Sequence, residues 1–142
     1  MRLDYSALER ATAQLQKSFR YLHSDLARQD SDLREQFRSA TIQALEYTYE
    51  LAVKMIRRQL SQIVSEPAGL RRIDFADVMR VAADAGIISD ARAFLRYREI
   101  RNKTSHTYNS DHAERTVDVV DDFLRDVDFL LRQLASRNRG TD

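Results

Sequence analysis

The chain has 142 residues, 43% of them hydrophobic and 32% charged, with three glycines, one proline, no cysteine and a net charge of +1. The length suits a single domain, residues 1–142, and the scarcity of helix-breaking residues favours an all-α fold. This composition excludes disulfides and argues against a protein that coats nucleic acid by bulk charge, and because no apolar run approaches the ~18 residues of a membrane span, we expect a cytoplasmic protein.

A mostly apolar stripe predicts a first amphipathic helix near the N-terminus. Its positions alternate in steps of three and four: Tyr5, Leu8, Thr12, Leu15, Phe19, Leu22 and Leu26. The polar residues 29–32 interrupt the stripe, and Ser31 or Asp32 is the expected N-cap of the next helix. His23 lies beside the stripe and is interpreted as a surface residue, because no other ligand type repeats at its spacing.

A longer stripe predicts a second helix of about thirty residues, which is about 45 Å at ~1.5 Å per residue and can form the spine of a bundle. Its apolar positions are Phe37, Leu45, Tyr49, Ala52, Ile56, Leu60 and Ile63. The helix should end before Pro67. Tyr47 and Tyr49 are two residues apart and cannot both face the core. Glu50 and Lys54 are spaced for an ion pair within the helix, which is their plain structural interpretation.

Two shorter helices are expected next. Asp74 can cap the first, from Phe75 to Ala85, and Gly86 closes it in the C′ role. Ser89 or Asp90 can cap the second, which runs from about residue 91 to 103 or 104.

The apolar face of this second short helix becomes basic in its last turns, in the order Ala91, Phe94, Leu95, Arg98 and Arg101. Because an unpaired buried arginine is costly, we expect an anion to meet an arginine there. Residues 92–103 carry five cations and one anion, whereas residues 111–128 carry seven anions and two cations. These runs are either solvated faces that partly neutralise one another or a local phosphate site.

The final helix is predicted to start at an Asp111 cap and to give way to a polar tail at about residues 136–142. Its apolar stripe is Val117, Val120, Leu124, Val127, Leu131 and Leu134. His112 falls in its first turn and is interpreted as a helix residue rather than a catalyst. The pattern as a whole predicts an up-and-down helical bundle of three long helices and two short ones.

Residues 101–108 concentrate the side chains that can do chemistry. Arg101 offers a permanently charged, planar fork suited to a phosphodiester, and His106 is suited to proton transfer near neutral pH. On an ideal helix these two side chains would point about 140° apart. They converge only if the helix ends between them or if a second copy of the chain supplies one of them. By composition alone, with twenty arginines in the chain, the spacing can arise by chance, and a solvated histidine at a helix end is the simpler interpretation.

The stretch from Arg101 to Tyr108 resembles the Arg-x4-His-x-Tyr motif of HEPN domains, in the version found in bacterial nucleotidyltransferase substrate-binding proteins. Asn102 fits the polar residue usual after the arginine. Glu50 and Lys54 match the acidic-x3-basic element that HEPN proteins often carry on the second helix. The resemblance spans nearly the whole chain and implies a HEPN-like helical domain.

The resemblance also implies an activity. Such proteins are similar to metal-independent RNases that act as toxins in toxin–antitoxin pairs and need no cofactor. Arg101 would orient the phosphate and His106 would be the acid/base. Asn102 would support the site, with Glu50 and Lys54 as weaker candidates.

The implied partners are an RNA substrate and a minimal nucleotidyltransferase, which silences the toxin by transferring AMP to Tyr108. A homodimer within a hetero-oligomer is also implied, with the two Arg/His sets facing across the interface. Two alternatives remain open at this point. The protein could be a non-catalytic subunit that holds a nucleotide for the nucleotidyltransferase, or a helical dimer without chemistry.

Overall fold

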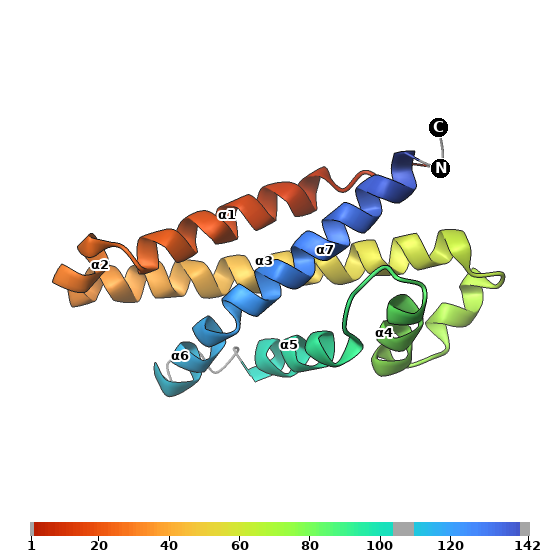
Figure 1. Cartoon of the computed structure of the whole chain (residues 1–142). Coiled ribbons are helices and arrows are strands. Elements are labelled where there is room, and N and C mark those ends of the chain that lie inside the picture. Colours follow the sequence, from red (N-terminus) through yellow and green to blue (C-terminus); the bar gives the residue numbers. More distant parts are fainter. Residues whose placement is uncertain (1, 104–109, 140–142) are drawn as a thin grey trace.

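The computed structural model describes residues 2–103 and 110–139. In these ranges the chain forms helices and no strand (Figure 1), which confirms the predicted all-α class. The elements are α1 (Ser6–Leu22), α2 (Asp25–Gln29), α3 (Ser31–Ile63), the 3-10 helix η1 (Pro67–Arg71), α4 (Phe75–Asp84), α5 (Ala91–Lys103), α6 (Ser110–Asp118) and α7 (Val120–Arg139). None of the described helices is both long enough and apolar enough to span a membrane.

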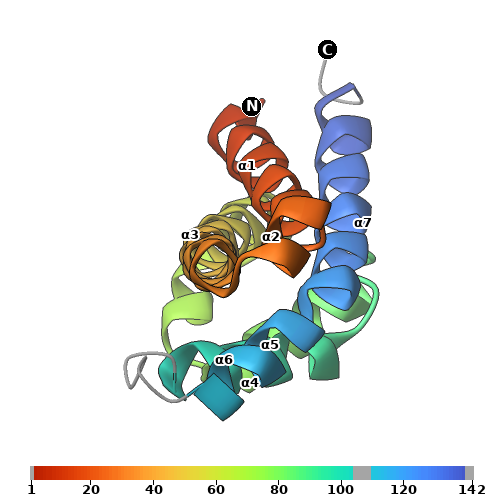
Figure 2. The ribbon, with the colours of Figure 1, turned by 90° about the vertical axis from the view of Figure 1, so that its left-hand side faces the viewer.

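Helix α3 is the spine of the bundle (Figure 1). Its 33 residues include no glycine or proline, and they span about 50 Å at ~1.5 Å per residue. The chain reverses through α2, so α1 lies back along α3, while α7 crosses both at an angle. A view from the left-hand end of Figure 1 shows α1 on one side of α3, and the group of α4, α5 and α6 on the other (Figure 2).

The main core collects apolar side chains from α1, α3, α4, α5 and α7. The largest fully buried ones include Leu8, Leu15, Ile56, Leu60, Met79, Phe94, Phe123, Leu130 and Leu134. The ring of Tyr97 lies edge-on to Phe94 and Phe123, with ring centres 5.5 and 5.1 Å apart. As predicted, Tyr47 and Tyr49 do not both face the core: Tyr49 is 6% exposed and Tyr47 is 57% exposed.

The predicted helix ends at Asp74 and Gly86 are confirmed. An Asp74 carboxylate oxygen accepts from the backbone N–H of Asp77 at 2.9 Å, and Gly86 has φ of +78°. The cap of α3 was predicted wrongly, since it is Asp30, which accepts from the N–H groups of Asp32 at 3.0 Å and Leu33 at 3.2 Å. Because α2 runs as far as Gln29, Asp30 is the residue with the extended backbone that a cap requires.

The single final helix that the stripe predicts is in fact two helices, α6 and α7, which break at Val119. Three β-branched valines lie at 117, 119 and 120, where side-chain crowding weakens helix propensity. At the break the Val119 N–H donates to the Thr116 carbonyl at 3.3 Å, a tighter i→i−3 turn. The break lets α6 turn away from α7 and pack on α3.

The predicted polar tail is also corrected, because α7 continues to Arg139. The Asn138 side chain accepts from the Leu3 N–H at 3.0 Å and donates to the Leu3 carbonyl at 2.8 Å. Arg137 donates to the carbonyl of Ala85 at 2.7 Å. These contacts fix the last turn of α7 to the chain start and to the end of α4, so the helix does not fray before Arg139.

Candidate functional site

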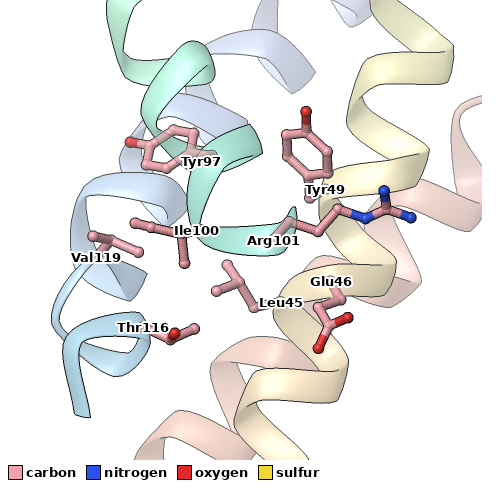
Figure 3. A pocket seen from close by; sticks show the side chains of 8 residues that line it. All are labelled: Leu45, Glu46, Tyr49, Tyr97, Ile100, Arg101, Thr116 and Val119. Atoms are coloured by element: carbon pink, nitrogen blue, oxygen red, sulfur yellow. The ribbon is translucent and has the colours of Figure 1, made fainter. Parts of the chain in front are cut away.

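Arg101 lies in the last described turn of α5 and donates a hydrogen bond to the Glu50 carboxylate on α3. The two side chains are 40% and 52% exposed, so the ion pair lies at the surface. In Figure 3 the Arg101 side chain extends from α5 across α3, with Tyr49 on one side and Glu46 on the other. The expectation that an anion meets an arginine at the basic end of this helix is therefore met by Glu50.

The plain interpretation of Glu50 as the partner of Lys54 does not describe its contact here. The carboxylate of Glu50 is engaged by a helix distant in sequence. Lys54 lies one turn farther along α3 with an exposed side chain. Glu50 thereby connects the motif arginine to the spine of the bundle.

Helix α5 is held from its other side by α7. Arg96 pairs with Asp122 at 3.1 Å, and the Tyr97 hydroxyl donates to the Asp126 carboxylate. The guanidinium of Arg96 also lies 5.6 Å from the centre of the Tyr97 ring. The basic run of α5 and the acidic run of α7 thus neutralise one another in part, whereas Arg101 pairs with α3.

A small pocket lies beneath the stem of Arg101 (Figure 3). Its walls come from α3, α5, α6 and the α6–α7 junction, and they are Leu45, Glu46, Tyr49, Tyr97, Ile100, Thr116 and Val119. These side chains are mostly apolar, and the aliphatic part of Arg101 completes the lining while its guanidinium reaches Glu50 at the surface. A long side chain whose stem is packed in this way keeps its charged end at the surface.

Tyr49 is the aromatic residue nearest to this arrangement on α3. Burial raises the pKa of Tyr49 to about 12, against the opposing influence of the cations of Arg98, Arg101 and Arg57. The hydroxyl therefore stays protonated near neutral pH and can donate a hydrogen bond. The cations of three arginines therefore lie within electrostatic reach of this hydroxyl.

Helix α6 is also anchored to α3. Glu114 accepts from Arg34 at 2.8 and 3.2 Å and from Arg38 at 2.9 Å. The hydrogen bond from Arg34, followed by that from Arg38, holds the pKa of Glu114 below its ordinary value. Helices α5 and α6 are each fixed to α3 by an arginine–glutamate pair.

Of the residues predicted from the sequence, the structure brings Arg101 and Glu50 together and leaves Asn102 and Lys54 exposed nearby. His106 and Tyr108 lie outside the described residues.

Sequence reasoning missed the Glu114 anchor. Arg34 and Arg38 are four residues apart on one helix face, and this spacing was the available signal of a site for a carboxylate. Nothing in the sequence indicated that α6 returns to α3 and brings Glu114 there. In the described ranges no three carboxylate or imidazole groups gather closely enough to hold a metal ion.

Comparisons with known proteins agree with this architecture. Residues 3–136 match the family model described as nucleotidyltransferase substrate binding protein like. A Haemophilus influenzae protein named probable ribonuclease HepT is 38% identical over 111 residues, which are 78% of this chain and 76% of that protein. The solved structure of HI0074, also from Haemophilus influenzae, is described as the fold of a substrate binding domain of a nucleotidyltransferase. It superposes with a TM-score of 0.86 at 32% identity, covering 93% of this chain and 99% of that one.

Proposed function

The chain belongs to the family of nucleotidyltransferase substrate-binding-like proteins, and from this premise we propose that it is a metal-independent RNase acting as a toxin. The observation that supports the proposal best is the surface ion pair of Arg101 and Glu50, which orients the motif arginine while leaving it accessible to solvent. Similarity to a probable ribonuclease supports the same activity.

In the proposed reaction, Arg101 binds the phosphate that is attacked. Glu50 engages one of its N–H groups, and a guanidinium carries five N–H donors in a planar fork that matches phosphate oxygens. As the 2′-oxygen attacks phosphorus, negative charge grows on the non-bridging oxygens and the guanidinium stabilises it. Asn102, exposed beside Arg101, would support the phosphate, and Lys54 would add a second cation from α3.

His106 would move the protons. An imidazole can take the proton of the 2′-hydroxyl, and an imidazolium can give a proton to the 5′-oxygen when the P–O5′ bond breaks. The products would be a 2′,3′-cyclic phosphate and a free 5′-hydroxyl, with no net change in protons. A homodimer that brings two Arg101/His106 sets together would provide both an acid and a base.

The partner we propose is a minimal nucleotidyltransferase that transfers AMP to Tyr108. The modification would place a phosphate and a purine two residues from His106, where charge and bulk would exclude RNA. In this scheme the partner is an antitoxin, and the toxin is active only while Tyr108 is unmodified.

A second function has its own support. The structural relative is described as a substrate binding domain of a nucleotidyltransferase, and an arginine held at the surface by Glu50 could bind a nucleotide phosphate without cleaving RNA. This alternative predicts nucleotide binding that depends on Arg101 and no RNase activity. The third interpretation, a helical dimer without chemistry, predicts neither.

The deciding experiment is cleavage of total cellular RNA by the purified full chain in EDTA. The wild type is compared with His106→Ala and with His23→Ala as the matched control, because His23 is exposed at the end of α1 and its ring contacts the Phe19 carbonyl. The intact mass of each sample is recorded, so that AMP on Tyr108 is not mistaken for inactivity.

We expect the wild type and His23→Ala to cleave RNA and His106→Ala to be inactive while it unfolds at the wild-type temperature. Intact RNA with an unmodified wild-type sample would reject the RNase proposal. Nucleotide titrations of wild type and Arg101→Gln would then test the binding alternative.

A further inference from the structure

A second basic surface lies at the C-terminal end of α3, beyond Arg101. A groove with an open volume of about 370 Å³ separates α3 from η1. Three arginines line it, Arg57 and Arg58 from α3 and Arg71 from η1. The rest of the lining is Ser61 and the apolar side chains of η1, Pro67, Ala68 and Leu70. All three arginines are exposed, and no carboxylate is among the lining residues. We call this surface the basic groove.

The arginines of the basic groove are not neutralised as other arginines of the protein are. Arg34, Arg96 and Arg101 each pair with a carboxylate. Within residues 2–103 and 110–139, no carboxylate lies within ion-pair distance of the three groove arginines.

Asp4 is the acid on which Arg58 acts, and its carboxylate is committed elsewhere. It accepts from the Ser6 hydroxyl at 2.6 Å and from the Ser6 N–H at 3.0 Å. Those hydrogen bonds are the main cause of its lowered pKa, and Arg58 contributes least. Three guanidinium groups therefore remain for an external anion.

The basic groove shares one face of α3 with Glu50, the partner of Arg101. Glu50, Lys54, Arg57 and Ser61 follow one another at steps of four, three and four, which places them on one stripe of the helix. All four are exposed. The cation of Arg57 acts on the Tyr49 hydroxyl together with those of Arg98 and Arg101. The stripe from Glu50 to Ser61 is about 16 Å long at ~1.5 Å per residue.

We propose that the basic groove binds the sugar–phosphate backbone of the RNA whose scissile phosphate lies at Arg101. The inference rests on the proposed RNase function and adds to it an extended substrate site. At ~3.4 Å per nucleotide of a stacked strand, the stripe matches about four to five nucleotides. Arg57, Arg58 and Arg71 contact successive phosphates, and Lys54 bridges the groove to the reacting centre.

The chemistry of the groove favours a nucleic-acid backbone over an acidic protein surface. Guanidinium forks match phosphate oxygens in paired hydrogen bonds, and Pro67, Ala68 and Leu70, which also line the groove, can contact sugar and base faces. The net charge of the chain is only +1, so three unpaired arginines in one groove form a local site rather than part of a generally basic surface.

The test measures binding of a labelled ten-nucleotide 2′-O-methyl RNA, which has the phosphate backbone but lacks the 2′-hydroxyl needed for cleavage. Binding is followed by fluorescence anisotropy over a range of salt concentrations. The groove variant Arg57→Gln/Arg58→Gln/Arg71→Gln is compared with the control Arg20→Gln/Arg28→Gln/Arg132→Gln, which removes the same charge from exposed positions on α1, α2 and α7. Thermal unfolding checks that each variant is folded. If a triple variant does not fold, its three single substitutions are measured in its place.

Because each phosphate contact contributes ~0.7 to the salt slope of a single strand, the groove variant should lose about 2 units of slope and bind about tenfold more weakly at low salt. Each single substitution should lose ~0.7. If the groove variant and the control share the same slope and affinity, the groove proposal is wrong.

Cleavage of an all-ribose substrate by the wild type is measured in parallel and reports on the proposed function alone. If the wild type cleaves RNA and the groove variant binds RNA as the wild type does, the groove proposal is wrong and the RNase proposal is supported. If the groove variant loses RNA binding but the wild type does not cleave RNA, the groove is supported as a binding site and the RNase proposal is wrong.

Discussion

Arg101 and Glu50, 51 positions apart in the sequence, form an ion pair that fixes the basic end of α5 to the middle of α3. Both side chains remain about half exposed. A pair of this kind contributes little to stability, but it does determine where the guanidinium lies. The arrangement explains how an arginine at the end of an amphipathic helix is oriented without being buried.

Glu50→Gln tests whether this carboxylate positions Arg101. We expect the free energy of unfolding to fall by less than ~1 kcal/mol, because the pair is solvent-exposed. We expect kcat for RNA cleavage to fall about tenfold with a smaller change in KM, because a misoriented guanidinium loses transition-state contacts first. Single-turnover kinetics and urea unfolding measure the two effects. Glu99→Gln, at an exposed position of α5, is the control, and a wild-type kcat for Glu50→Gln would reject the positioning role.

Arg101→Lys and Arg101→Gln separate charge from shape. A lysine keeps the charge but not the planar fork, so we expect cleavage to fall about tenfold for Lys and about a hundredfold for Gln. Both variants should fold, since the side chain is 40% exposed. Initial rates on an RNA oligonucleotide give the result, with Arg92→Gln on the same helix as the control. If Arg101→Lys and Arg101→Gln cleave RNA as fast as the Arg92→Gln control, Arg101 does not take part in catalysis.

Glu114→Gln tests the anchor between α3 and α6 and its pH dependence. The pKa of Glu114 is lowered by the hydrogen bonds from Arg34 and Arg38, so the carboxylate stabilises the fold above its ordinary pKa of 4.5 and loses this effect as the pH falls through the folded value. Because the side chain is 42% exposed, we expect a cost of ~1 kcal/mol or less at pH 7.

The measurement is thermal unfolding of wild type and Glu114→Gln at pH 7 and at several values below 4.5. The difference between them should be largest at pH 7 and shrink on acidification. Glu35→Gln, whose carboxylate is 67% exposed and 4.0 Å from Arg38, is the control. A difference that is independent of pH would mean that the carboxylate charge is not what anchors α6.

Asn138→Ala tests the contact between the chain start and the end of α7. It removes the hydrogen bonds to the N–H and carbonyl groups of Leu3, and we expect a loss of ~1–2 kcal/mol in the free energy of unfolding. Ending the chain at Ser136 also removes the Arg137 contact with Ala85 and should cost more. Ending it at Arg139 keeps both contacts and should leave the unfolding midpoint near that of the full chain.

The sequence determined the helices and most of their boundaries. Apolar residues at steps of three and four predicted α1, α3 and α7, and the caps Asp74 and Asp90 and the positive φ of Gly86 followed from local chemistry. It also indicated the family, through the arginine, histidine and tyrosine of residues 101–108. These features depend on neighbours in the chain, which a sequence shows directly.

Only the tertiary structure decided which helices meet. The pairing of Arg101 with Glu50, the anchor of Glu114 on Arg34 and Arg38, and the basic groove between α3 and η1 each join residues far apart in sequence. The apolar stripe of α7 was visible but its break at Val119 was not predicted, because Val117 and Val120, which weaken the helix there, also continue the apolar stripe. Charged side chains at a helix surface can choose among many partners, and the packing of the apolar faces brings one of them within reach.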